Sequence, residues 1–264
     1  DLDHTEFAGP TLADIAREKV GISKLTSTLV VGDVNDDLHQ IWSSAPSRGL
    51  VRRIEHFDCI GNELAVGGRL LDVSTPRSVY RDVMVPLHGR HQGDNASIAI
   101  VAVEEFFDAP IADDVLREGM AQIEMPGRFE VLGHRPLVVI DGAHNPAGAD
   151  VCSTVFFDDF SPTGRRILVV GTLRGRDPEL TLGALRADDF DVVVTCTAPS
   201  PRGLDSSTLA QTARSMGCAE VVACDSVEDA CAKALSIAGE DDAVLVAGSL
   251  YVVGSARTTL RPSL

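Results

Sequence analysis

The sequence predicts an α/β protein whose second half is a doubly wound, mostly parallel, Rossmann-like domain. From residue 137 onward, apolar segments of strand length alternate with helical segments in a nearly regular rhythm. Some of these segments, such as residues 168–170 and 192–194, are apolar at every position, as strands buried on both faces are. Before residue 125 the pattern is mixed, which indicates a separate first domain.

In the first domain, a helix is expected over residues 11–19, with Thr11 as its N-cap. A strand at 29–32 and a helix at 34–43 follow. Residues 51–85 alternate polar and apolar side chains around turns at 61–62 and 67–68, which predicts hairpin strands. Two further helices are expected at 94–107 and 112–123.

A domain junction is predicted at residues 125–128, because Pro126 and Gly127 break the preceding helix. The two domains would then cover residues 1–125 and 126–264. In the second domain the expected strands lie at residues 137–140, 167–170, 192–196, 220–223 and 243–247. The expected helices lie between them, at 146–159, 178–187, 206–216 and 227–238.

Composition restricts the function classes. The chain has 39 acidic and 23 basic side chains, and its formal net charge of −16 argues against nucleic acid or an anionic membrane as partner. A small nucleotide remains possible, because a few local donors can hold it. The longest apolar runs are strand-sized, too short to cross a bilayer. The six cysteines show no CxxC spacing, so reduced thiols in a cytoplasmic protein are expected.

The most informative motif is the run from Asp141 to Pro146, with sequence DGAHNP, between an apolar strand and a predicted helix. An acid at a strand end, a turn with His144 and Asn145, and a helix start are typical of a site for a phosphorylated ligand. The alternative is a turn in which Asp141 caps the helix and Asn145-Pro146 ends the strand.

Four other residues are candidates for chemistry, each with a simpler alternative. His4, between two carboxylates, is a potential metal ligand or a solvated side chain. Lys19 would ordinarily form a surface ion pair with Glu18. In the polar loop 87–96, either Asp94 or Asn95 caps the next helix, or side-chain amides, that of Asn95 among them, bind a base edge. Arg128 either binds a phosphate bidentately or pins the domain junction.

Taken in order, several blocks resemble the Mur ligase superfamily and, within it, the folylpolyglutamate synthase/dihydrofolate synthase family. The matching blocks are LDHTE (2–6), IAREKVGI (15–22), LHG with Gln92 and Asn95-Ala96, PGRFE (126–130), DGAHNP (141–146), GTL with Asp177, SPR (200–202) and GSLYVVG (248–254). They cover essentially the whole chain with sensible spacing.

This resemblance implies an ATP-dependent ligase that adds L-glutamate to dihydropteroate or a folate through an acyl phosphate. It implies that His4 and a carbamylated Lys19 bind Mg²⁺, that Asn95 contacts adenine and Arg128 the phosphates, and that Asp141 contacts the ribose or a nearby phosphate. His144 would lie near the same site, as a catalytic residue. A carbamate suits this role, because Mg²⁺ prefers anionic oxygen ligands. The resemblance also suggests a monomer.

One departure from the family pattern matters. No GxxxxGK[ST] phosphate loop occurs in the 264 residues. The chain is therefore expected to comprise the C-terminal part of a central ATP-binding domain plus a C-terminal domain, and to be a fragment that is inactive alone. The alternatives are a Mur-type ligase for a cell-wall precursor, a non-catalytic nucleotide-binding or interaction module, and a dinucleotide-dependent oxidoreductase. The last is disfavoured, because no GxGxxG follows the first strand of the second half.

Overall fold

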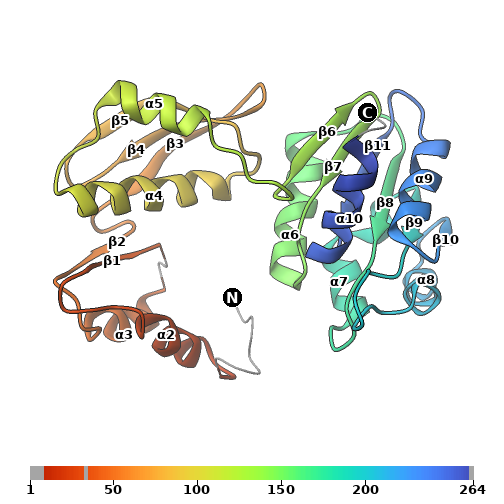
Figure 1. The fold of residues 1–264 in the computed structure, drawn as a ribbon, viewed down its shortest axis with the longest axis horizontal. Coiled ribbons are helices and arrows are strands. Elements are labelled where there is room, and N and C mark those ends of the chain that lie inside the picture. The colour runs from red at the N-terminus through yellow and green to blue at the C-terminus, as the bar shows by residue number, and fades with distance from the viewer. Residues whose placement is uncertain (1–8, 33–34, 262–264) are drawn as a thin grey trace. The chain divides into compact units, whose positions relative to one another are not determined.

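The computed structural model describes residues 9–32 and 35–261 (Figure 1). The chain divides into two compact units, Asp1–Glu124 and Met125–Leu264. Each unit has its own sheets and its own hydrophobic clusters. None of the described helices combines the length and the apolar character needed to cross a membrane.

The first unit begins with a small parallel sheet covered by helices. Helix α2 (Leu12–Val20) starts at Thr11, whose hydroxyl accepts from the Asp14 N–H at 3.2 Å, so the predicted cap is confirmed. Strands β1 (Thr28–Val31) and β2 (Gly49–Arg52) pair in parallel. Between them lie η1 (Asp36–Leu38) and α3 (His39–Ser43) in place of the single helix expected over 34–43. Trp42 packs among the buried apolar side chains of this part.

An antiparallel meander follows, built from β3 (Asp58–Ala65), β4 (Gly68–Ser74) and β5 (Val79–Val85). Helices α4 (His91–Phe107) and α5 (Asp113–Ala121) pack against it. The turn at Gly67 is confirmed, with φ of +80°. The turn expected at residues 61–62 is wrong, because both lie inside β3 beside an irregularity in its ladder with β4.

The second unit contains one six-stranded sheet with the order β10-β9-β8-β11-β7-β6. Its parallel strands are β7 (Leu137–Ile140), β8 (Arg166–Val170), β9 (Val192–Thr195), β10 (Val221–Ala223) and β11 (Ala243–Ala247). The mostly parallel doubly wound sheet is therefore confirmed. An additional edge strand, β6 (Glu130–His134), runs antiparallel to β7 and was not expected.

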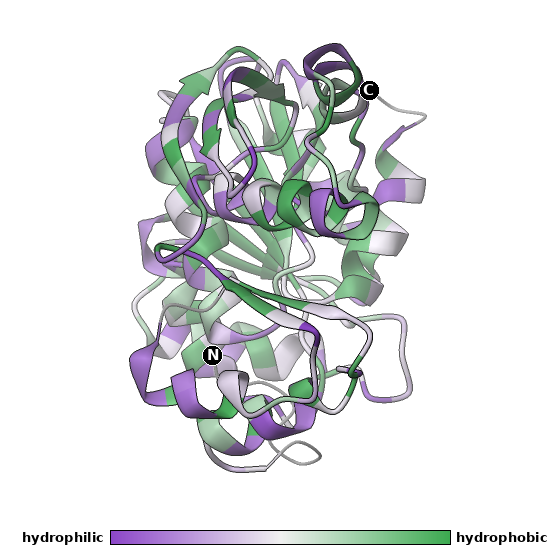
Figure 2. Ribbon diagram, turned by 90° about the vertical axis from the view of Figure 1, so that its left-hand side faces the viewer, coloured by the Kyte–Doolittle hydropathy of each residue, from purple (hydrophilic) through white to green (hydrophobic). Residues whose placement is uncertain are grey.

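Helices cover both faces of this sheet. The first hydrophobic cluster joins one face to α6 (Pro146–Thr154), its π-helical continuation η2 (Val155–Asp159), α7 (Pro178–Ala184), η3 (Ala187–Asp189) and α8 (Ser206–Ser215). The second cluster joins the other face to α9 (Val227–Ile237) and α10 (Leu250–Leu260). Figure 2 shows hydrophobic residues concentrated along the strands. Helix α10 was not expected. All six cysteines are free thiols.

Candidate active site

The carboxyl ends of three neighbouring strands, β7, β8 and β11, form a tightly packed edge in the second unit. The Gly248 N–H donates to the carbonyl of Ala143 at 3.1 Å, which joins the end of β11 to the DGAHNP turn. Gly248 has φ of +109°, and a Cβ there would lie 2.6 Å from the carbonyl oxygen of Gly171. A side chain at this position would collide with backbone, so glycine lets the strand ends approach one another. In parallel sheets this edge is the usual location of ligand sites.

Asp141, directly after β7, holds two separate turns through its carboxylate. Its Oδ2 accepts from the Phe129 N–H at 2.7 Å, and its Oδ1 accepts from the Ala143 N–H at 2.8 Å. Asp141 does not cap α6. Asn145 does, because its Oδ1 accepts from the Gly148 N–H at 2.8 Å and Pro146 occupies the first helical position.

Arg128 lies in the turn that Asp141 holds. The Gly142 N–H donates to the carbonyl of Gly127 at 2.7 Å, and Gly127 has φ of +70°. The Phe129 side chain is buried beside the ring of Phe160. The Arg128 side chain is exposed, and its guanidinium forms no ion pair within the described residues. The turn therefore has a fixed backbone and a free cation with five donors.

His144 is half-buried in the same turn. Its Nδ1 lies 2.9 Å from the carbonyl oxygen of Gly142. A carbonyl oxygen only accepts, so we assign a hydrogen to Nδ1.

Two helices begin at this edge, α6 after Asn145 and α10 after Ser249. The buried Ser249 hydroxyl accepts from the Val252 N–H at 3.2 Å and caps α10. Helix N-termini carry partial positive charge and free N–H groups, which favour anions. The edge thus combines the Arg128 cation, two helix N-termini, a carboxylate and an imidazole.

The first unit contains the other expected site residues. Lys19 lies in the last turn of α2, exposed, and forms no ion pair with Glu18. Asn95 is exposed on α4, and its Nδ2 donates to Oε1 of Gln92 at 3.1 Å. No hydrogen bond or ion pair joins Lys19 to Asn95 in the described part of the chain. His4 lies outside the described residues.

Helix α4 starts three residues earlier than expected, so neither Asp94 nor Asn95 is a cap. Its first turn is anchored to β3, because Asn62 Nδ2 donates to the carbonyl of Arg90 at 2.7 Å. The buried Arg69 donates in turn to the Asn62 side chain and, at 3.2 Å, to its carbonyl. A Cβ on Gly93 would lie 2.3 Å from Asn62 Nδ2, so only glycine permits this contact. The pair Gly61-Asn62 predicted a turn from the sequence; in the structure, Asn62 instead anchors the start of α4.

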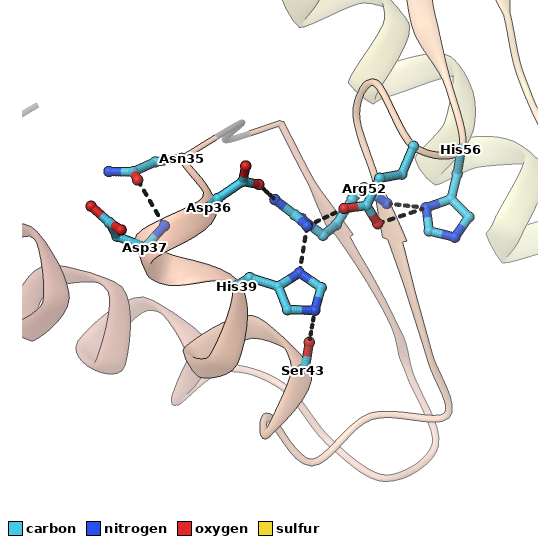
Figure 3. A network of polar contacts seen from close by, with 8 residues as sticks. Asn35, Asp36, Asp37, His39, Ser43, Arg52 and His56 are labelled. Atoms are coloured by element: carbon cyan, nitrogen blue, oxygen red, sulfur yellow. Dashed lines mark hydrogen bonds and ion pairs between the residues drawn. The ribbon is translucent and has the colours of Figure 1, made fainter.

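A second polar cluster, which the sequence did not reveal, lies at the carboxyl ends of β1 and β2 (Figure 3). The guanidinium of the buried Arg52 contacts His39 Nδ1 and Glu55 and lies 3.4 Å from Asp36. The Arg52 N–H donates to His56 Nδ1 at 3.1 Å. A guanidinium and a backbone N–H only donate, so His39 and His56 each accept at Nδ1. No group of three metal-binding side chains gathers anywhere in the described ranges.

The comparisons first identify a class. Residues 127–250 match the family described as Mur ligase, glutamate ligase domain. This range covers most of the second unit, including the Arg128 and DGAHNP turns. The second unit is therefore similar to the Mur ligase glutamate ligase domain.

The relatives specify the class further. The chain is 32% identical to a dihydrofolate synthase/folylpolyglutamate synthase from Mycobacterium tuberculosis over 97% of this chain and 58% of that protein. It superimposes on the solved M. tuberculosis folylpolyglutamate synthase complexed with ADP with a TM-score of 0.87 and 32% identity, covering 98% of this chain and 61% of the other. It also resembles the Yersinia pestis bifunctional folylpolyglutamate synthase/dihydrofolate synthase solved with Mn, AMPPNP and L-glutamate bound. The TM-score is 0.79 and the identity 26%, and the match covers 100% of this chain and 60% of the other. The chain is thus similar to folylpolyglutamate synthases and dihydrofolate synthases, and it spans about three fifths of the length of these relatives.

Proposed function

We propose that this chain forms part of an ATP-dependent ligase that joins L-glutamate to dihydropteroate or to a folate. The observation that carries the proposal is the locked Arg128 turn, held by Asp141 beside two helix N-termini. This arrangement suits an anionic ligand with several phosphate oxygens. The ADP complex of the M. tuberculosis homologue supports a nucleotide as that ligand.

The proposed reaction has two steps, a phosphoryl transfer and the formation of an amide bond. A carboxylate oxygen of the acceptor attacks the γ-phosphorus of ATP, which gives an acyl phosphate and releases ADP. The amino group of glutamate then attacks the acyl carbon, an amide bond forms, and inorganic phosphate leaves. The attacking amine must lose a proton, and we assign its uptake to the imidazole of His144, in the turn beside Asp141.

The remaining roles follow from the donors that each residue presents. Arg128 binds and orients the phosphates. Asp141 lies in the same turn as His144, and its carboxylate suits a contact with the ribose or a nearby phosphate group. Asn95 presents an exposed amide, which suits the edge of adenine.

Mg²⁺ would be held by His4 and by Lys19 after carbamylation. The exposed position of Lys19 at a helix end fits the modification, because carbon dioxide must reach the amine. When bound, the metal supplies positive charge to the transferring phosphoryl group.

The 264 residues contain no GxxxxGK[ST] loop, so we propose that the chain alone binds nucleotide weakly and does not turn over. Assays should combine the purified chain, and a ligase that includes it together with such a loop, with ATP, Mg²⁺, glutamate and each candidate acceptor. We expect glutamate-dependent ADP formation only with the loop present and only with a pterin acceptor. Turnover with a cell-wall precursor instead, or with no acceptor at all, would refute the folate assignment.

A further inference from the structure

Glu130, the first residue of β6, connects the Arg128 turn to the last helix of the unit. Its Oε2 accepts from the Gly127 N–H at 2.8 Å. The Nε of Arg257, on α10, lies 3.0 Å from Oε1 and 2.9 Å from Oε2. Arg261 Nη2 adds a contact to Oε1 at 3.2 Å. One carboxylate therefore joins a backbone N–H of the turn to Arg257 on α10 and to Arg261, the C-cap of that helix.

The same face of α10 also packs on the glycines of the site. A Cβ on Gly127 would lie 2.8 Å from Val253 Cγ1, and one on Gly142 would lie 2.5 Å from Leu250 Cδ2. Leu250, Val253 and Arg257 are spaced by three and four residues, so they share one face of the helix. Helix α10 thus contacts the turn through two apolar side chains and one ion pair.

The backbone on both sides of Arg128 is held. The Gly127 N–H is bound by Glu130, and the Phe129 N–H by Asp141. The Gly127 carbonyl accepts from Gly142. Phe129 has φ of +44°, a conformation that an L side chain adopts only when its surroundings enforce it. These bonds fix where the Arg128 side chain leaves the backbone.

The charges in this arrangement also matter. A carboxylate two residues from Arg128 could pair with that guanidinium, or it could repel a phosphate bound there. Arg257 and Arg261 bind Glu130 instead, and they neutralise its charge. Arg128 is left without an ion pair in the described chain.

We propose that Glu130 and Arg257 are positioning residues for the phosphate-binding Arg128. Together they hold the turn through the Gly127 N–H, and Arg257 keeps the Glu130 carboxylate away from the Arg128 guanidinium. This inference rests on the proposed nucleotide role of Arg128 and extends it to two residues that need not touch the ligand.

A matched control exists at the opposite end of the same sheet. Asp242, before β11, accepts from two backbone N–H groups, Arg165 at 2.8 Å and Gly239 at 2.9 Å. The Arg165 guanidinium contacts its Oδ2 at 3.2 and 3.1 Å. The side chains of Asp242 and Glu130 are similarly buried, at 12% and 17% exposed. Asp242→Asn therefore removes the same kind of charge from the same unit, away from the site.

The test uses the whole 264-residue chain and the variants Glu130→Gln, Arg257→Met, Arg257→Lys, Arg128→Met and Asp242→Asn. Hydrogen exchange of the Gly127 amide and calorimetric titration with ADP are measured on each, with the melting temperature as a check of folding. We expect Glu130→Gln and Arg257→Met to speed Gly127 exchange and weaken ADP binding by about tenfold each, the effect of losing one charge-assisted hydrogen bond. Arg257→Lys should exchange Gly127 more slowly and bind ADP more tightly than Arg257→Met. Asp242→Asn should leave both the Gly127 exchange rate and the ADP affinity unchanged.

The outcomes separate this inference from the proposed function. If Glu130→Gln changes Gly127 exchange and ADP affinity no more than Asp242→Asn does, the positioning role is overturned. If Arg128→Met binds ADP as well as the wild type, the nucleotide role of Arg128 is overturned. Glu130 and Arg257 would then not serve nucleotide binding. In that case faster Gly127 exchange in Glu130→Gln would still establish that the carboxylate holds the turn.

Discussion

The carboxylate of Asp141 accepts from the Phe129 N–H at 2.7 Å, across the start of β6 and the end of β7. This bond makes one structural unit of two motifs that are separated along the chain. The Arg128 turn is positioned by Asp141, so the acid has a structural role besides the ligand contact that the family resemblance implies.

We expect Asp141→Ala to lower the free energy of unfolding by about 3 kcal/mol, because two backbone N–H groups lose a charged acceptor. Asp141→Asn keeps one acceptor oxygen and should lose about half as much. Urea denaturation monitored by circular dichroism measures both. Asp205→Ala is the control, since Asp205 is an exposed helix cap and its loss should cost only about 1 kcal/mol. Equal losses for Asp141→Ala and Asp205→Ala would contradict the structural role.

The close approach of Gly142 to Leu250 leads us to a second prediction, on the stability of variants at these two positions. A Cβ on Gly142 would lie 2.5 Å from Leu250 Cδ2, so Gly142→Ala should destabilise the protein by about 1–3 kcal/mol. Leu250 is 55% exposed, and Leu250→Ala alone should cost less than about 1 kcal/mol. The double variant should recover part of the loss, because the colliding atoms are gone. Strictly additive effects in denaturation measurements would show that the side chain and the glycine do not interact.

A third prediction concerns pH. Burial raises the pKa of Glu130, but bonds from Arg257 and from the Gly127 N–H outweigh it, so the pKa lies below its ordinary value. A carboxyl with a lowered folded-state pKa contributes stability above its unfolded-state pKa, about 4.3, and loses it as the pH falls through the folded value. The unfolding free energy of the wild type should therefore exceed that of Glu130→Gln at pH 7. This difference should shrink steadily below about pH 4.3.

Thermal or urea unfolding at a series of pH values measures this difference directly. Asp242→Asn should show a similar acid-dependent difference from the wild type, because bonds from Gly239 and Arg165 overcome burial and lower the Asp242 pKa as well. A gap between wild type and Glu130→Gln that stays constant from pH 7 to pH 3 would disprove the assignment.

The charge of the whole chain predicts a salt effect. A formal net charge of −16 on 264 residues makes the compact state repel itself. Raising KCl to 1 M shortens the Debye length to about 3 Å and screens this repulsion. The melting temperature should rise by a few degrees between 0.05 and 1 M KCl, with an uncharged osmolyte as control. A melting temperature that falls with added KCl would mean that attractive ion pairs outweigh the repulsion.

The sequence predicted the parallel sheet well, because β7, β8, β9 and β11 are apolar on both faces and flanked by helices. It missed β6, because Glu130, Gly133 and His134 do not form a pattern typical of a strand. This segment becomes a strand by pairing with β7. It missed α10, where Val252, Val253 and Gly254 have low helix propensity and burial in the core decides. The first turn of α4 looked like a loop because it is polar.

The residues of the candidate site were selected from the sequence, but their arrangement in space was not. Arg128 and Asp141 were both selected, yet their proximity depends on the pairing of Glu130 with Ile140 in the β6–β7 ladder. The role of Glu130 depends on Arg257, which is 127 positions away in sequence. Local patterns do not contain such long-range contacts, and only the folded chain reveals them.

The strand order also has a consequence for how the protein is made. Strand β11 (Ala243–Ala247) lies between β7 and β8, so the two strands synthesised earlier do not pair with each other. On the ribosome, the middle of the sheet stays open until the last strand of the unit has emerged. The Asp141 N–H, which donates to Val246, and the Arg128 turn, which Arg257 supports, are completed only then. Folding of the second unit should therefore wait for β11, and the apolar edges of β7 and β8 need protection until that strand has emerged.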